Sequence, residues 1–231
     1  MIIHQANSRG MADHGWLNSH HTFSFANYFE ASRMGFGKLR VLNDDVVAAG
    51  RGFGTHPHRD MEIISIPLEG SLKHSDSEGN EQLIKKGDVQ IMSAGTGVSH
   101  SEFNYSQVDA VSFLQIWVEP KKMGIKPRYE QKTYVLKKNE WSLLVSPELK
   151  PESVWINQDA FFSITKLEAG HIKYSKYIKS NLVYVFILNG TLNIQGKEFR
   201  QRDGIGLEEG EDNVEFSSTL SSEILVMEVP R

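Results

Sequence analysis

The sequence predicts an all-β protein built from two copies of one β unit. Short runs rich in Val, Ile, Phe and Leu are separated by turn residues at frequent intervals, which is typical of a β-sandwich or barrel. No long segment keeps a helical period, and only residues 26–34 and 157–160 predict a turn or two of helix. The segment 66–72 resembles the segment 186–192, with Gly70 matching Gly190 at an offset of 120, which indicates an internal repeat.

Several hydrophobic runs are closed by turn residues and are the clearest predicted strands. Three of them are Leu39–Leu42 before Asn43-Asp44-Asp45, Met61–Leu68 before Glu69-Gly70, and Val89–Met92 before Ser93-Ala94-Gly95. Two dipeptides, Gly79-Asn80 and Gly196-Lys197, each stand between two strand-like runs and predict hairpin turns.

The junction between the two units is predicted in the stretch from Pro120 to Glu140. This division gives an N-terminal metal-binding barrel over residues 1–133 and a C-terminal metal-free barrel over residues 134–231. The stretch also carries a basic cluster, which we interpret as a solvated connection rather than an anion site. Its members are Lys121, Lys122, Lys126, Arg128 and Lys132.

Composition excludes several classes of function. The 231 residues include no cysteine, so disulfides, thiolate metal sites and thiol nucleophiles are absent, and His and carboxylate remain as metal ligands. The net charge of −4 argues against nucleic acid as a partner, because phosphate binding needs a concentrated positive field. The longest apolar run, Leu182 to Leu188, is too short for a membrane span, and no signal peptide is predicted at the N-terminus. A cytoplasmic location is the expectation.

Two pairs of potential metal ligands stand two residues apart, His56 with His58 and His100 with Glu102. Residues at this spacing on a strand project from the same face, about 6.6–6.8 Å apart. If the two strands are antiparallel neighbours, the four side chains form a compact quadrilateral around one cation. An isolated His-x-His is only moderately specific, but two pairs that each follow a glycine-rich turn predict one bound divalent metal ion.

This ligand set suits Fe, Mn, Ni, Cu or Zn, and the lack of thiolate argues against a purely structural zinc. One carboxylate leaves a divalent ion with net positive charge, and four protein ligands leave open positions in an octahedral shell. The combination favours an anionic oxygen ligand such as a phenolate or an enolate, with dioxygen beside it.

Other candidate residues carry weaker signals. Adjacent His20 and His21 point to opposite faces of a strand, so surface or capping roles are preferred over a shared metal. Gly50, Gly52 and Gly54 precede neither Lys-Ser/Thr nor a helix, so a tight approach to the metal strand is preferred over a phosphate cradle. Isolated histidines that receive no role are His4, His14, His74 and His171. We interpret four aromatic residues as part of the core, and one or two of them could line a pocket. They are Trp16, Phe53, Phe113 and Trp117.

Two patterns of glycine, histidine and carboxylate resemble the two motifs of the cupin superfamily. They are Gly50-x5-His56-x-His58-x3-Glu62 followed by Gly70, and Gly87 followed by Gly97-x2-His100-x3-Asn104. More narrowly, four segments resemble the pirin family: HGWLNSHHTFSFANYF, LRVLNDDVVAAGRGFGTHPHRDMEI, IMSAGTGVSHSEFN and IKPRYEQ. The resemblance covers most of residues 4–131 and is diffuse in the second half.

The pirin resemblance implies an all-β fold of two cupin barrels, each a double-stranded β-helix or jelly roll, with metal only in the first. The family's ligands map onto His56, His58, His100 and Glu102. The general cupin carboxylate position falls on Glu62, which would share a face with the His56 pair on a regular strand but is left outside the ligand set by the pirin resemblance.

Two departures from the cupin pattern stand out: the spacing from Glu62 to Gly70 is one residue longer than usual, and Ser93 stands where many cupins have Pro. The repeat supports a metal-free second barrel. At the offset of 120, His56 falls on Lys176 and His58 on Ile178, and the region 214–216 has no histidine.

Bacterial pirins are similar to quercetin 2,3-dioxygenases, so the resemblance implies a metal-dependent dioxygenase that opens the flavonol heterocycle with release of carbon monoxide. The metal would anchor the flavonolate, and Glu102 would also serve as the catalytic base. The expected cofactor is one divalent ion, with Fe(II) preferred over Ni, Mn, Cu, Co or Zn. The expected partners are dioxygen and a flavonol or another enolic substrate. The alternative is a non-enzymatic, iron-binding, redox-responsive regulator that acts through a protein partner.

Overall fold

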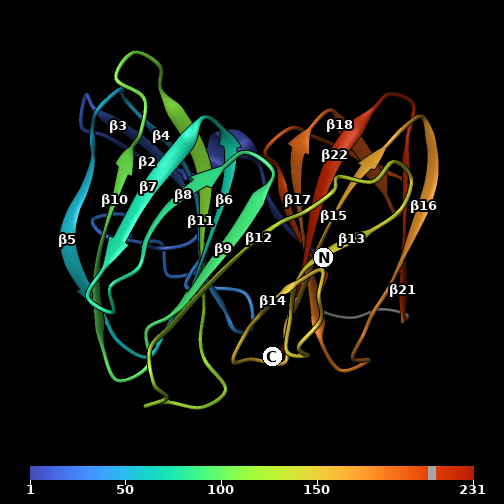
Figure 1. Ribbon diagram of the computed structural model, residues 1–231. Coiled ribbons are helices and arrows are strands. Elements are labelled where there is room, and N and C mark those ends of the chain that lie inside the picture. The colour runs from blue at the N-terminus through green and yellow to red at the C-terminus, as the bar shows by residue number, and fades with distance from the viewer. Residues whose placement is uncertain (208–211) are drawn as a thin grey trace.

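The computed structural model describes residues 1–207 and 212–231, which form two β-barrels lying side by side (Figure 1). Within these ranges the helical structure is limited to the 3-10 helix η1 (Ala6–Ser8). The helical turns predicted at residues 26–34 and 157–160 are wrong, because both segments form turns, bends or isolated bridges. In the described ranges no helix has the length and apolar character needed to cross a lipid bilayer.

The first barrel consists of one large and one small antiparallel sheet. In spatial order the large sheet contains β12 (Arg128–Thr133), β9 (Asp88–Ser93), β6 (Glu62–Glu69), β11 (Val111–Val118), β4 (Leu39–Val47), β3 (Leu17–His21) and β2 (Gly10–Asp13). The small sheet contains β5 (Gly52–His58), β10 (Val98–Asn104), β7 (Ser71–Asp76) and β8 (Glu81–Lys85).

The second barrel has the same division into a large and a small sheet. In spatial order the large sheet contains β1 (Ile2–His4), β20 (Gly204–Leu207), β17 (Leu182–Asn189), β22 (Ser222–Val229), β15 (Phe161–Leu167), β13 (Ser142–Ser146) and β14 (Val154–Trp155). The small sheet contains β16 (Gly170–Ser175), β21 (Asn213–Ser218), β18 (Thr191–Ile194) and β19 (Lys197–Arg200).

The predicted internal repeat is confirmed by the order of the strands. The small sheets run β5-β10-β7-β8 and β16-β21-β18-β19, which are the same sequence of steps along the two units. Gly70 and Gly190, the pair that defines the offset, lie at equivalent turns between β6 and β7 and between β17 and β18. Their φ angles are +75° and +83°, a conformation that only glycine adopts readily.

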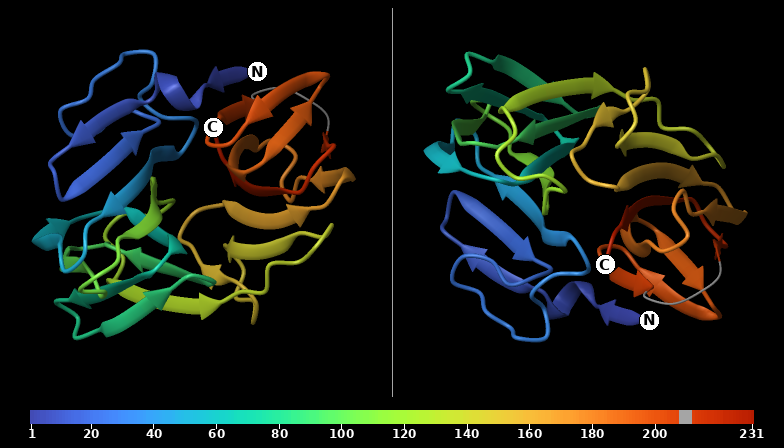
Figure 2. Two further views of the ribbon diagram at one scale, coloured as in Figure 1. Left: turned by 90° about the horizontal axis from the view of Figure 1, so that it is seen from above. Right: turned by 90° about the horizontal axis from the view of Figure 1, so that it is seen from below.

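The first strand of the chain belongs to the second barrel. Strand β1 pairs with β20 and therefore lies in the large sheet of the second barrel, although it opens the chain. Strand β12, the last strand before residue 134, pairs with β9 at the edge of the first barrel. Figure 2 shows the N-terminal segment beside the second barrel. The division after residue 133 stays a prediction, and the pairing of β1 places residues 2–4 across it.

A shared hydrophobic core joins the two large sheets. Buried side chains from the first unit, among them Leu42 and Ile64, form one cluster with side chains from the second unit such as Phe162 and Phe186. Burial of the apolar side chains in this cluster is the main contribution that stabilises the pair of barrels. The interior of the second barrel holds a single further cluster, whereas the interior of the first holds two separate ones. Polar residues of the small sheet occupy part of the first barrel.

The basic residues of the connection are mostly neutralised by carboxylates. Lys121 pairs with Asp159 at 2.7 Å. Arg128 and Lys132 pair with Glu130 at 2.7 and 3.1 Å. The Lys121 side chain is 62% exposed, which agrees with a solvated connection. For Arg128 and Lys132 that interpretation is wrong, because both lie in strand β12 with side chains only 29% and 27% exposed.

The turn predicted at Asn43-Asp44-Asp45 is wrong, because β4 continues through all three residues to Val47. The three side chains are buried rather than solvated. Asp44 forms ion pairs with Arg9 at 3.4 Å and with Arg202 of the second unit at 2.9 Å. Partners distant in the sequence therefore satisfy polar groups that locally favour a turn. The hairpins predicted at 79–80 and 196–197 are confirmed, the latter with its tight turn centred at 195–196.

Candidate metal centre

Strands β5 and β10 are antiparallel neighbours, as the ligand spacing requires. His56 lies directly opposite His100, and His58 lies opposite Val98. The register shifts between His100 and Glu102, so that Glu102 lies opposite Phe53. The four side chains therefore do not form the regular quadrilateral that the ligand spacing predicts. A β-bulge between His100 and Glu102 changes the direction of Glu102 relative to the three histidines.

Local sequence explains why β5 can carry the motif His-Pro-His. Pro57 lacks a backbone N–H, and β5 is an edge strand, where the missing donor costs little. Gly52 allows the backbone of β5 to approach β10 closely. A Cβ at this position would stand 2.3 Å from the carbonyl oxygen of Glu102 and 2.5 Å from the Cα of Phe103. Gly52 therefore gives the tight approach between strands that its place before the metal-binding histidines predicts.

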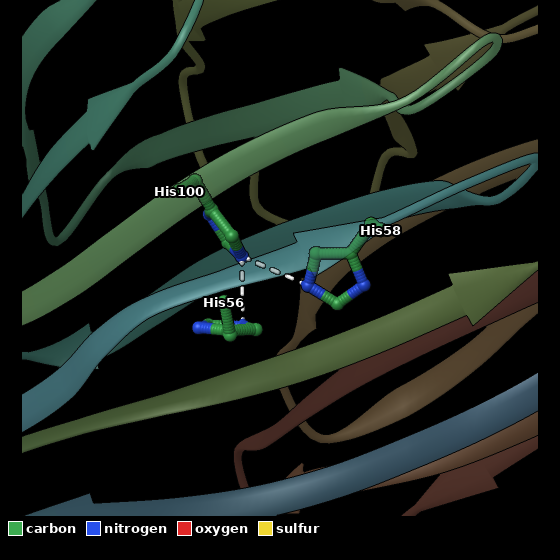
Figure 3. A group of neighbouring side chains, drawn as sticks. All are labelled: His56, His58 and His100. Carbon is green, nitrogen blue, oxygen red and sulfur yellow. Dashed lines mark hydrogen bonds between the residues drawn. The ribbon is translucent and has the colours of Figure 1, made fainter.

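The three histidines point their rings toward one another (Figure 3). Nε2 of His100 lies 3.0 Å from Nε2 of His58 and 3.1 Å from Nε2 of His56. Nδ1 of His56 donates to the carbonyl oxygen of Gly54 at 2.8 Å, so a neutral ring carries its lone pair on Nε2. Two adjacent ligands at about 2.1 Å from one octahedral ion are about 3.0 Å apart. The observed separations fit a single cation held between the rings.

The surroundings keep the imidazoles of His58 and His100 neutral. Burial lowers the pKa of His100 to about 2, and His56 and His58 beside it add to the shift. Burial also lowers the pKa of His58 to about 4, with His56 as the second cause. A metal ion competes with protons for the same lone pairs, so rings that stay unprotonated at neutral pH are ready ligands.

Glu102 is buried beside this group. Its Oε1 accepts a hydrogen bond from the hydroxyl of Ser65 at 3.0 Å, and its Oε2 accepts one from Nε2 of Gln115 at 2.7 Å. A ligand atom of Glu102 lies within 4.8 Å of ligand atoms of both His74 and His100. Burial raises the pKa of Glu102, although His74 and Ser65 oppose the shift. The carboxylate thus lies beside His100 and His74 in a fixed orientation, and at this distance it is not grouped with His56 and His58.

Glu62 lies away from the histidines. The backbone turns at Asp60, which has a φ of +47°, so β5 ends at His58 and β6 begins at Glu62. The carboxylate of Glu62 accepts hydrogen bonds from Ser93 at 2.8 Å and from the backbone N–H of Asn157 at 3.2 Å. Burial raises its pKa to about 7. Glu62, which has the longer spacing to Gly70, therefore contacts Ser93, which stands where many cupins have Pro. This contact lies outside the histidine group.

His74, for which the sequence predicts no role, is a neighbour of the site. Its side chain is fully buried in β7, and its Nδ1 lies 3.5 Å from Nδ1 of His100. It belongs to a second group of potential ligands with His100 and Glu102. The spacing His74-x-Asp76, with alternate residues on one face of a strand, is the signal that could have found it.

A cavity of about 360 Å³ opens beside the histidine group. His56, His58 and Glu102 line one part of it. Aromatic rings line much of the rest, and among them Trp117 contacts His58 edge-to-face with ring centroids 5.1 Å apart. Pockets of roughly 300–1,000 Å³ that are mostly apolar, with a few polar groups, are typical small-molecule sites.

Three residues that line this cavity each have a buried side-chain polar atom without a hydrogen-bond partner. The atoms are Nδ1 of His21, Oδ1 of Asn43 and Nε1 of Trp117. Because an unpaired buried polar group costs free energy, a shift of these side chains that pairs the atoms would be favourable. The interpretation of His21 as a surface or capping residue is wrong, since it is buried.

The aromatic residues interpreted as core divide into two sets. Phe113 is fully buried in the core. Trp16, Phe53 and Trp117 line the cavity, which is one more than the one or two expected.

Asp45 gives the cavity wall a pH-dependent effect on stability. Burial raises its pKa to about 7, while the hydrogen bond from Ser19 opposes the shift. A folded-state pKa above the unfolded value means that the contribution is present at low pH and is lost as the pH rises toward 7. We expect Asp45→Asn to reduce the fall in unfolding free energy between pH 5 and pH 8 by on the order of 2 kcal/mol. Urea denaturation of the metal-free protein at both pH values measures this.

The matched control for that experiment is Asp109→Asn, which changes an exposed aspartate of the same unit. It should leave the pH dependence of the wild type intact. An equal fall in stability in the Asp45→Asn variant and in the wild type would contradict the assignment.

The second barrel offers no comparable group of ligands among residues 134–207 and 212–231. Nζ of Lys176, the counterpart of His56 in the repeat, donates to the carbonyl oxygens of Lys179 and Asn181. The absence of metal from this barrel stays a prediction.

Comparison with known proteins gives matches over nearly the whole chain. The family model described as Pirin matches residues 3–118, and the model described as Quercetinase C-terminal cupin domain matches residues 143–229. The protein named quercetin 2,3-dioxygenase from Escherichia coli strain K12 is 40% identical over 230 residues, which cover 100% of this chain and 99% of that protein. A pirin-like protein from Caulobacter vibrioides is 36% identical over 203 residues, 87% of each chain.

Solved structures agree with these matches. The crystal structure of the bacterial pirin YhhW from Escherichia coli in complex with nickel(II) is 40% identical, with a TM-score of 0.93 over 99% of this chain and 98% of that one. The sequence matches, the two barrels and the histidine group in the first of them agree with one another. This chain belongs to the pirin family, with two cupin-type domains and a site suited to one metal ion.

Proposed function

We propose that this protein is a metal-dependent dioxygenase that acts on flavonols and opens their heterocycle with release of carbon monoxide. One observation carries the proposal: an aromatic-lined cavity of about 360 Å³ opens directly onto converging histidine nitrogens and a buried carboxylate. The name of the Escherichia coli relative, quercetin 2,3-dioxygenase, supports the same reaction.

In this proposal His56, His58, His100 and Glu102 hold one divalent ion, with Fe(II) as the preferred metal. When bound, the ion supplies Lewis acidity toward an enolic oxygen and one-electron chemistry with dioxygen. The nickel(II) complex of the Escherichia coli pirin supports a divalent metal in this family and leaves Ni as a second choice. The three nitrogens and one carboxylate suit both ions.

Glu102 is proposed as the catalytic base. It lines the cavity, so it faces the side from which a guest must approach. Hydrogen bonds from Ser65 and Gln115 hold its two oxygens, which fixes the direction of the remaining lone pairs. A carboxylate held in this way can take the proton from a substrate hydroxyl group beside the ion.

The cavity walls suit a planar polyphenol. Trp16, Phe53 and Trp117 offer aromatic surface to a flat ring system. Enclosure by these rings also excludes water, which strengthens the electrostatic interactions of the polar groups. His21 and Asn43, each with an unpaired buried polar atom, belong to the same walls, and a shift of these side chains would let them pair with hydroxyl groups of the guest.

Anaerobic loading with Fe(II), followed by quercetin and air, tests the proposal. We expect the absorbance of the flavonol to disappear, with one carbon monoxide released for each quercetin and dioxygen consumed. Protein treated with a chelator is the control and should not turn over.

Absence of turnover with Fe, Ni, Mn, Co, Cu and Zn would contradict the proposal that the protein is a dioxygenase. If a protein partner were then captured only by the metal-loaded form, the alternative of an iron-binding regulator would replace that proposal. Turnover of a different enolic compound at a much higher kcat/KM would keep the chemistry and change the substrate.

A further inference from the structure

His74 and Asp76 lie behind the metal centre, on the side away from the guest cavity. Both belong to β7, which pairs with β10 so that His74 is opposite Glu102 and Asp76 is opposite His100. Their side chains are 0% and 1% exposed. Nε2 of His74 lies 3.0 Å from Oδ2 of Asp76, and Nδ1 of His74 lies 3.5 Å from Nδ1 of His100. The three side chains form one chain of contacts that ends at a predicted ligand.

Asp76 is fixed as an acceptor at the outer end of this chain. Its Oδ1 accepts backbone N–H groups of Glu78 and Asn80, both at 3.0 Å. The side-chain amide of Asn80 bonds to both of its oxygens, at 3.1 and 2.9 Å. A carboxyl group that accepts this many donors on both oxygens is an ionised carboxylate, which cannot donate.

The acceptor state of Asp76 fixes where the proton of a neutral His74 lies. Because Asp76 only accepts, a neutral His74 carries its proton on Nε2 and its lone pair on Nδ1. The contact between the two Nδ1 atoms then needs a proton from His100. His100 is therefore protonated on Nδ1 and keeps its lone pair on Nε2, the atom that faces His56 and His58.

We propose that His74 and Asp76 are positioning residues of the metal centre, which set the tautomer and the ring orientation of His100 so that its Nε2 faces the ion. This inference rests on the proposed role of His100 as a metal ligand. The ring of Tyr129 packs against that of His74, with ring centroids 4.8 Å apart, and restricts the movement of His74. Partners of this kind orient ligand histidines in metalloproteins and raise their basicity.

A positioning role fits His74 better than a role as ligand. Both of its ring nitrogens already have partners, Asp76 and His100. The Nε2 atoms of His56, His58 and His100 have only one another. An ion bound at His74 would have to displace one of these two contacts, whereas an ion between the other three rings displaces none.

The first test measures nickel(II) affinity by competition with a chelator, without substrate. We expect His74→Leu to weaken the dissociation constant about 10- to 100-fold, the range for loss of such a partner. His74→Asn restores an acceptor near the position of Nδ1 and should recover part of the affinity. Lys73→Ala, on the exposed face of the same strand, is the matched control and should bind like the wild type.

The second test reads the tautomer directly by nitrogen–proton correlation NMR of the metal-free protein. In the wild type we expect His100 to carry its proton on Nδ1. In His74→Leu we expect a mixture that includes the Nε2-protonated form, and Asp76→Asn should shift the balance in the same direction. A purely structural role for His74 would leave this signature unchanged.

The outcomes separate this inference from the proposed function. Unchanged affinity and an unchanged His100 tautomer in folded His74→Leu, or in Asp76→Asn if the first variant fails to fold, would overturn the positioning role. Metal-shifted resonances of His74 in the zinc-loaded wild type would overturn it too, by making His74 a ligand. A wild type that does not bind nickel at all would instead overturn the metal centre itself.

Discussion

His100→Ala should abolish tight metal binding and, with it, flavonol turnover. His100 is the one residue whose Nε2 contacts both His56 and His58, so its loss removes the central member of the group. Four-ligand zinc sites bind with about 10–16 kcal/mol, or about 3 kcal/mol for each ligand, which corresponds to roughly a 100-fold weaker dissociation constant. Titration with Fe(II) or Ni(II), together with metal analysis of the purified variant, measures the loss.

The control for this variant is His171→Ala, which removes an exposed histidine from the second barrel. It should bind metal and turn over quercetin like the wild type. A thermal melt of metal-free His100→Ala separates loss of the site from loss of the fold. If the folded variant bound the ion as tightly as its parent, the site would have to be placed elsewhere.

Glu102→Gln should reduce kcat about 10²- to 10⁴-fold at full metal occupancy, the range for removal of a general base. The substitution keeps the size of the side chain and an oxygen that can accept from Ser65 or Gln115, but it removes the charge and the basic lone pairs. Metal affinity should fall as well, because a carboxylate ligand becomes a neutral amide. Steady-state rates in saturating metal, compared with metal content, resolve the two effects.

The comparison variant is Glu81→Gln, which alters an exposed glutamate on β8 of the same small sheet and should change neither quantity. Full recovery of the Glu102→Gln rate in excess metal would leave Glu102 as a ligand only. Unchanged rate and unchanged affinity would remove it from both roles.

Much of the fold could be predicted because strand signals are local. A period of two and turn glycines such as Gly70 and Gly190 are visible in any window of the sequence. The error at Asn43-Asp44-Asp45 has a different origin. Those residues favour a turn when judged locally, and only partners far along the chain, Arg9 and Arg202, make a strand acceptable there.

The candidate site could be predicted to the same extent. His56, His58 and His100 follow from spacing two residues apart, since alternation on a strand fixes which side chains share a face. The stagger of Glu102 could not be predicted, because it depends on a bulge in the pairing of two strands. His74 and His21 were missed for a related reason. Neither belongs to a pair of histidines two residues apart, and the importance of each depends on a neighbouring strand that the sequence alone does not assign.

The pairing of β1 has a consequence for how the chain can be divided. No single cut separates the two barrels completely, since a cut after residue 133 keeps every strand of the first barrel but removes β1 from the sheet of the second. A fragment ending near residue 118 would leave β9 with a bare edge open to aggregation, and its own first strand would lack a sheet to join. A fragment that begins near residue 134 would need β1 supplied as a separate peptide to complete its large sheet.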